Sequence, residues 1–241
     1  MNILFYRYGS ICEPDIIASF KHLGFNITED TREVYNKQLL PSDCIKGLNE
    51  LLKQDTYSFI FSINFFPSVS DVCNIWGIPY LCLIVDSPVL ELFSTSLANP
   101  CNKVFLFDRQ LYNDFHHINP DGIFHIPLAT NVRDNYATAT MASAADRARF
   151  SSDISFIGSL YSEKCLYNKI TLPEKMRGYV DGLIEAQLLV YGYNFIEECV
   201  TPELIDSFTK ARPELTNFPS SMKVDTKAVI AQHIISVKVA E

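Results

Sequence analysis

The residue best suited to proton transfer is Asp86, which directly follows the apolar segment YLCLIV. A carboxylate at the end of a buried strand is unfavourable unless it is paired or functional. Asp86 could accept the proton of an attacking hydroxyl group, provided that partial burial makes the carboxylate a stronger base. The neighbouring Ser87 could bind the same substrate. The alternative is structural, because Asp86 and Ser87 both suit the N-cap of a helix and Pro88 follows them.

A second candidate position is the turn at Gly9 and Ser10, after the N-terminal apolar run. Unpaired backbone N–H groups and the helix dipole make the start of a helix a site for anions or hydroxyl groups. The turn contains neither GxGxxG nor a Walker A motif, so the sequence does not indicate dinucleotide or P-loop binding. Alternatively, Gly9 only makes the turn, and Ser10 caps the helix in a capping box with Glu13.

Two asparagines follow other apolar segments. Asn64 precedes Phe65 and Phe66, and the three could line a substrate cleft, although both phenylalanines could equally pack in the core. Asn131 lies just beyond HIPLA and is a further candidate for substrate binding. His125, inside that segment, is more typical of a core histidine than of a base.

Other kinds of chemistry have no residues to carry them. The sequence contains no GxSxG, HExxH or CxxC motif, and its seven cysteines share no ligand spacing with the five histidines. We therefore expect reduced thiols, no metal and no cofactor. A net charge of −8 without runs of Lys or Arg disfavours nucleic-acid partners. The sequence lacks a signal peptide and an apolar run long enough to cross a membrane, which predicts a cytoplasmic protein.

Apolar runs and helical patterns alternate along the first half of the chain, which predicts the elements that hold these residues. We expect strands over residues 2–8, 25–28, 57–66, 79–86, 103–108 and 122–129, with helices starting near Ser10, Ser42, Ser68 and Asp108. This alternation predicts an α/β fold with a Rossmann-like parallel sheet and helices on both faces. Ligands of such sheets bind at the carboxyl ends of the strands, where all the candidate residues lie.

The second half of the chain has a different composition. We predict a Rossmann-like domain over 1–131, a linker over 132–152 that is rich in small and polar residues, and a mostly helical segment over 153–241. A helix predicted from about residue 222 reaches Glu241 without a stop signal. We therefore expect the chain to be a fragment of a longer protein.

Several blocks of the sequence resemble a bacterial family, the N-terminal domain of glycosyltransferases related to spore-maturation-type proteins. These blocks are FSINFFPSVSDVCNIWGIPYLCLIVDSPV, NPCNKVFLFDRQLYNDF, IFHIPLATNV, DISFIGSLYSEK and LPEKMRGYVDGLIEAQLLVYGYN. The resemblance implies the GT-B architecture, in which an N-terminal Rossmann-like domain holds the acceptor and a C-terminal domain holds the nucleotide-sugar donor. It implies no obligatory metal.

On this resemblance, residues 1–131 form the acceptor-side domain and 153–241 begin the donor-side domain. Gly158 and Ser159, in FIGSLYS, would approach the phosphates of the donor, where glycine permits close approach of the backbone; a plain strand-end turn is the alternative. The remaining βα units of such enzymes are missing from this sequence, so we expect little or no transferase activity from this chain alone.

The leading hypothesis is therefore a glycosyltransferase fragment that transfers a sugar from a nucleotide-sugar donor to a hydroxyl acceptor. Asp86 would be the base, and Gly9, Ser10, Asn64, Ser87 and Asn131 would line the acceptor cleft. The alternative hypothesis is a non-catalytic α/β binding or interaction module. In that case the apolar region around Leu183, Leu188 and Tyr191 would dock on a partner or on a second copy of the chain.

Overall fold

The computed structural model describes residues 1–37, 39–131, 140–155, 158, 165–213, 222 and 225–239. The chain divides into two compact units, the N-terminal unit Met1–Arg149 and the C-terminal unit Phe150–Glu241. The boundary lies inside the range 132–152, which the sequence analysis treats as a linker. The assignment of 153–241 to a donor-side domain stays a prediction.

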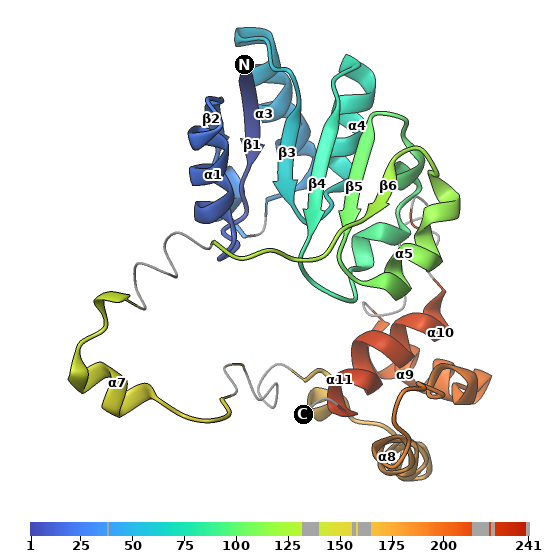
Figure 1. The fold of residues 1–241 in the computed structure, drawn as a ribbon. Helices are drawn as coiled ribbons and strands as arrows, with labels where there is room; N and C mark the ends of the chain where they lie inside the picture. Colours follow the sequence, from blue (N-terminus) through green and yellow to red (C-terminus); the bar gives the residue numbers. More distant parts are fainter. Residues whose placement is uncertain are drawn as a thin grey trace. The chain divides into compact units, whose positions relative to one another are not determined.

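The N-terminal unit is built on one sheet of parallel strands. The strands are β1 (Asn2–Tyr6), β2 (Asn26–Asp30), β3 (Ile60–Ile63), β4 (Tyr80–Ile84), β5 (Asn102–Leu106) and β6 (Ile123–His125). Their order in the sheet is β2-β1-β3-β4-β5-β6, and all neighbours are parallel. All six arrows therefore point the same way in Figure 1. This confirms the predicted Rossmann-like α/β fold.

Helices cover both faces of this sheet (Figure 1). They are α1 (Glu13–His22), α2 (Arg32–Tyr35), α3 (Pro41–Gln54), α4 (Pro67–Trp76) and α5 (Arg109–Phe115), with short 3₁₀ turns η1 (Leu90–Phe93), η2 (Thr95–Ala98) and η3 (His116–Ile118). A further helix, α7 (Ala144–Phe150), contains the boundary between the two units. Buried residues of α3, α4 and α5 share the larger core cluster with the strands. On the other face, Ile17 of α1 packs with Phe5 and Phe61.

The helix starts expected near Ser68 and Asp108 are confirmed. Gly77 ends α4 in the left-handed conformation, with φ of 67°, and the Asp108 carboxylate caps α5 by accepting hydrogen bonds from the amides of Gln110 and Leu111. The helix expected near Ser42 begins at Pro41 with Leu40 as its N-cap, so Ser42 does not cap it. Proline at the first helical position supplies a fixed φ and lacks the N–H that a cap would otherwise satisfy.

The core of the C-terminal unit is formed by helices. These are η4 (Tyr167–Lys169), α8 (Glu174–Leu188), η5 (Glu197–Cys199), α9 (Pro202–Ala211), α10 (Thr226–Val229), the π-helical η7 (Ile230–Ile235) and α11 (Ser236–Val239). Thr201 caps α9 as its neighbour Pro202 suggests, since its Oγ1 accepts a hydrogen bond from the Leu204 amide. In the described parts of the chain, no helix combines the length and the apolar character that crossing a membrane would demand.

Candidate functional site

The candidate site lies where the carboxyl ends of β1, β3 and β4 meet. From β1 the chain moves to β2 on one side, and it then returns to add β3, β4, β5 and β6 on the other. Loops therefore diverge between β1 and β3, and in open parallel sheets this switch point is the place where ligands bind. Tyr8, Asn64 and Asp86 follow β1, β3 and β4 at this edge.

Asn64 connects the three strand ends through its side-chain amide. Its Nδ2 donates hydrogen bonds to Oδ2 of Asp86 at 2.6 Å and to the hydroxyl of Tyr8 at 3.0 Å. Its Oδ1 accepts the backbone N–H of Val85 at 3.1 Å, which fixes the orientation of the amide. Both amide protons are thus directed at Asp86 and Tyr8, so the three side chains form one hydrogen-bonded group.

Tyr8 is the member of this group that the sequence analysis missed. Its ring is half-buried and lies 5.5 Å from that of Phe66, centroid to centroid. Burial raises the pKa of the Tyr8 hydroxyl; the hydrogen bond from Ser10 lowers it, and the negative charge of Asp86 raises it. Tyr8 therefore stays protonated at neutral pH and can donate a hydrogen bond. The sequence did contain a signal for Tyr8, because it is an aromatic residue two positions beyond the end of β1, at the carboxyl edge of the sheet.

Asp86 differs from its predicted environment in two ways. Its side chain is exposed, not partly buried as expected. It also caps no helix, because η1 begins after Val89 and takes no side-chain cap. Within the described part of the chain, the Asp86 carboxylate accepts a hydrogen bond only from Asn64, which leaves Oδ1 open to a ligand.

The next strand end adds a second carboxylate. The hydroxyl of Ser87 donates to Oδ2 of Asp108 at 2.6 Å, while Oδ1 of Asp108 accepts the Gln110 amide at 2.7 Å. Ser87 thereby links the loop after β4 to the loop after β5. Both Ser87 and Asp86 are exposed, so this row of polar groups continues along the accessible edge of the sheet.

The turn after β1 is occupied by a side chain of the protein itself. Glu13 is fully buried, and its Oε1 accepts the backbone N–H groups of Tyr8 and Gly9, each at 2.9 Å. Its Oε2 accepts a hydrogen bond from Nε of Arg7 at 2.9 Å. The proposed anion or hydroxyl site at Gly9 is therefore wrong for this N–H group, because a carboxylate already takes the position that a ligand anion would use.

Ser10 does not form the predicted capping box. Helix α1 begins at Glu13 with Cys12 as its N-cap, and the Ser10 hydroxyl accepts the Cys12 amide at 3.3 Å. Glu13 bonds to the amides of the preceding turn rather than to that of Ser10. Ser10 instead lies beside the Tyr8 hydroxyl, so it reaches the Tyr8–Asn64–Asp86 group through Tyr8.

The remaining predicted residues lie elsewhere. Asn131 donates from Nδ2 to Oδ1 of Asp15, at the start of α1, at 3.1 Å. His125 is half-buried and makes an edge contact with the Tyr112 ring, as a packed histidine does. Gly158 is exposed, and Ser159 lies outside the described residues, so the predicted phosphate site stays a prediction.

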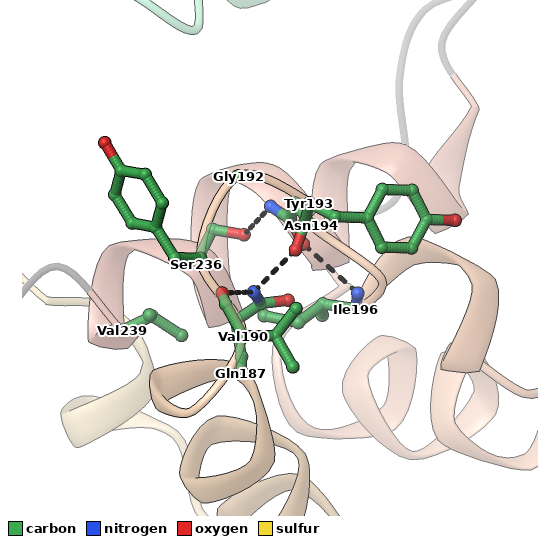
Figure 2. A pocket seen from close by; sticks show the side chains of 9 residues that line it. Gln187, Val190, Gly192, Tyr193, Asn194, Ile196, Ser236 and Val239 are labelled. Carbon is green, nitrogen blue, oxygen red and sulfur yellow. Dashed lines mark hydrogen bonds between the residues drawn. The ribbon is translucent and has the colours of Figure 1, made fainter.

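A separate open pocket of about 440 Å³ lies in the C-terminal unit (Figure 2). It is lined by Gln187, Val190, Tyr191, Gly192, Tyr193, Asn194, Ile196, Ser236 and Val239. The buried Gln187 donates to the carbonyl groups of Val190 and Tyr193 and accepts the Phe195 amide, so its amide holds the loop. Asn194 likewise donates to Ser236 and accepts the Ile196 amide. Both amide side chains thus hold the backbone of the pocket in place, and none of the described lining residues carries a carboxylate or a basic group.

The chemistry available at the sheet edge is hydrogen bonding and proton acceptance. Among the described residues, no three His, Cys, Asp or Glu side chains gather into a group that could hold a metal ion. The candidate site thus consists of Tyr8, Asn64 and Asp86, extended by Ser10, Ser87 and Asp108. No protein family matches this chain, and neither a curated protein nor a solved structure does.

Proposed function

We propose that the sheet edge of the N-terminal unit binds a hydroxyl-bearing sugar acceptor, to which a sugar is transferred from a nucleotide-sugar donor. The observation that carries this proposal is the convergence of three strand ends on Asn64, which donates to Asp86 at 2.6 Å and to Tyr8 at 3.0 Å. This arrangement offers a hydrogen-bond acceptor, the Asp86 carboxylate, and a hydrogen-bond donor, the Tyr8 hydroxyl, side by side. Sugar hydroxyl groups both donate and accept, so they fit such alternating partners.

The charges at this edge favour a neutral ligand over a phosphate. Arg7 pairs with Glu13 and Glu29, and Arg32 pairs with the buried Asp30. The two N–H groups that could cradle a phosphate bind Glu13. Asp86 would repel a phosphate, and Lys37, the cation beside Tyr8, already donates to the Tyr8 carbonyl oxygen. These features support an acceptor-binding role for the N-terminal unit, with the nucleotide-sugar bound elsewhere.

In the proposed reaction, the acceptor hydroxyl oxygen attacks the anomeric carbon of the donor sugar. Its proton passes to Asp86, and the bond between the sugar and the diphosphate breaks, with the electron pair leaving on the diphosphate. Asn64 would orient the Asp86 carboxylate through its hydrogen bond. Stabilisation of the leaving diphosphate is assigned to the donor side, where Gly158 and Ser159 are the proposed contacts. The sequence resemblance to glycosyltransferases supports this assignment.

Binding of neutral sugars tests the acceptor site directly. A panel of mono- and oligosaccharides, free phosphate and nucleotide-sugars would be titrated against the full chain by ligand-observed NMR and calorimetry. We expect a neutral sugar to bind and the Asp86→Asn variant to bind it about ten- to 150-fold more weakly, since a hydrogen bond to a charged group is worth about 1.5–3 kcal/mol. Asp55→Asn is the matched control, because Asp55 is exposed and lies between α3 and β3, at the amino edge of the sheet.

The same variants test the proton-transfer role. In a longer version of the protein that releases nucleoside diphosphate from a donor, Asp86→Asn should lower the rate of release at least about 100-fold, in the range typical of a lost general base. An unchanged rate would remove Asp86 from the reaction. Absence of binding to every sugar in the panel would refute the acceptor site and favour the non-catalytic interaction module.

A further inference from the structure

Asn64 has an unusual backbone conformation at the centre of the candidate site. Its φ is 57°, which makes it the sole non-glycine residue with positive φ among the residues that the structure describes. Asparagine tolerates this left-handed region better than most residues, but the conformation persists only where neighbouring groups hold it. The residues that hold Asn64 therefore control the geometry of the site.

A buried chain of hydroxyl groups supplies this restraint. The hydroxyl of Ser62 donates to the carbonyl oxygen of Asn64 at 2.7 Å. Because Ser62 has a single proton, the Tyr80 hydroxyl must be the donor in its 2.6 Å hydrogen bond to Ser62. The Tyr80 oxygen in turn accepts the backbone N–H of Phe66 at 3.0 Å. The donor and the acceptor of each of these hydrogen bonds are thus determined.

The chain of hydrogen bonds fixes both sides of the turn after β3. Ser62 and Tyr80 are fully buried, so water cannot replace either hydroxyl at low cost. Ser62 holds the carbonyl of Asn64 inward, and Tyr80 holds the amide of Phe66. The Asn64 side chain is thereby left on the edge of the sheet, where it accepts the Val85 amide and donates to Asp86.

We infer that Tyr80 and Ser62 are positioning residues of the candidate site, which act through the backbone of Asn64 to place its amide against Asp86 and Tyr8. Neither residue would touch a ligand. The role in ligand binding rests on the proposed function, whereas the positioning itself can be measured without a ligand.

Hydrogen exchange at Val85 is the ligand-free test. The Val85 N–H donates to Asn64, so it reports whether the amide stays in place. In both Tyr80→Phe and Ser62→Ala we expect it to exchange about tenfold faster or more, as loss of one hydrogen bond implies. The Val104 amide, bonded to Gly122 in the neighbouring part of the sheet, should keep its rate. Equal acceleration at Val104 would mean general destabilisation, and an unchanged Val85 rate would overturn the inference.

Tyr57→Phe is the matched control variant. Tyr57 is also buried in the core of the N-terminal unit, and its hydroxyl makes no hydrogen bond to the described residues. Removing that hydroxyl should leave Val85 exchange unchanged. Acceleration equal to that in Tyr80→Phe would show that the effect belongs to the loss of any tyrosine hydroxyl in this core.

Sugar affinity provides the second readout. We expect Tyr80→Phe and Asn64→Ala each to weaken binding by about tenfold. Combining the two should add little, because both remove the same contact. Normal affinity in Tyr80→Phe would overturn the inference. If the wild-type chain binds no sugar, the proposed function fails, and the Val85 exchange rates still decide whether Tyr80 and Ser62 position Asn64.

Discussion

Glu13 offers the sharpest test of how the turn after β1 is held. Its carboxylate is fully buried and receives hydrogen bonds from Arg7 and from the amides of Tyr8 and Gly9, all at 2.9 Å. Two substitutions separate these contacts. Glu13→Ala removes both acceptor oxygens and with them all three hydrogen bonds, whereas Glu13→Gln keeps a carbonyl oxygen for the two amides and loses only the ion pair with Arg7.

The magnitudes follow from the number and kind of bonds. Hydrogen bonds to a charged group contribute about 1.5–3 kcal/mol each, so three would sum to about 4.5–9 kcal/mol. The exposed Gly9 lets water reach part of the turn, which lowers this sum. We expect Glu13→Ala to cost about 3–5 kcal/mol of unfolding free energy, as breaking a buried ion pair does. Glu13→Gln should cost about 1–2 kcal/mol, because Arg7 retains Glu29 as a partner.

Urea unfolding followed by tryptophan fluorescence is the suitable assay. Trp76 is the single tryptophan of the chain and belongs to α4, so its signal reports unfolding of the N-terminal unit alone. The control is Glu29→Gln, which removes the other, more exposed partner of Arg7 and should cost less than about 1 kcal/mol.

Two results would refute this reasoning. If Glu13→Gln lowered the free energy of unfolding as much as Glu13→Ala does, the ion pair and not the amide contacts would hold the turn. If Glu13→Ala cost no more than the Glu29→Gln control, the buried carboxylate would have little role in stability, and the turn could be open to a ligand anion after all.

Three further predictions concern other contacts. Burial raises the pKa of Glu33 above its ordinary value of 4.5, because the buried side chain favours the neutral acid. The stability contributed by this neutral acid is present at low pH and is lost as the pH rises through the raised pKa. Glu33→Gln, which keeps an acceptor for the Tyr6 hydroxyl, should therefore raise the melting temperature at pH 7, with a difference that shrinks toward pH 4. Asp86→Asn should lower the pKa of Tyr8, measured by ¹³C NMR of the ring, because the Asp86 charge raises it; an unchanged pKa would contradict this electrostatic coupling. Gln187→Ala should increase the rate of deuterium uptake in the loop after α8 at least about tenfold, since the three hydrogen bonds of the Gln187 side-chain amide are lost.

The strands and the ligand edge were predictable from the sequence, because both depend on local patterns. Continuous apolar runs such as residues 57–66 are typical of strands buried on both faces, and β3 lies within that run. Once the strands are parallel, residues that follow them must share one edge. This is why Asn64 and Asp86, 22 positions apart, could be expected to lie close together.

Contacts that depend on the path of a loop were not predictable. Ser10 and Glu13 have the spacing of a capping box, yet the chain enters α1 later, and Glu13 turns back to the amides of Tyr8 and Gly9. The two arrangements have the same sequence signature and differ only in the backbone angles of the turn. The exposure of Asp86 has a similar origin, since it depends on the course of the residues that follow β4.

The occupied turn after β1 has a consequence for how this edge can recognise a ligand. Where backbone N–H groups bind a phosphate, recognition depends on the shape of the turn and tolerates many side-chain changes. Here Glu13 takes the amides of Tyr8 and Gly9, so side chains must supply the contacts that remain. Asn64 and Asp86 stand on separate strands, and Asn64 is held by buried hydroxyl groups rather than by the ligand. A site of this kind is preorganised before binding, and it depends on a few side chains whose removal one at a time should be felt directly.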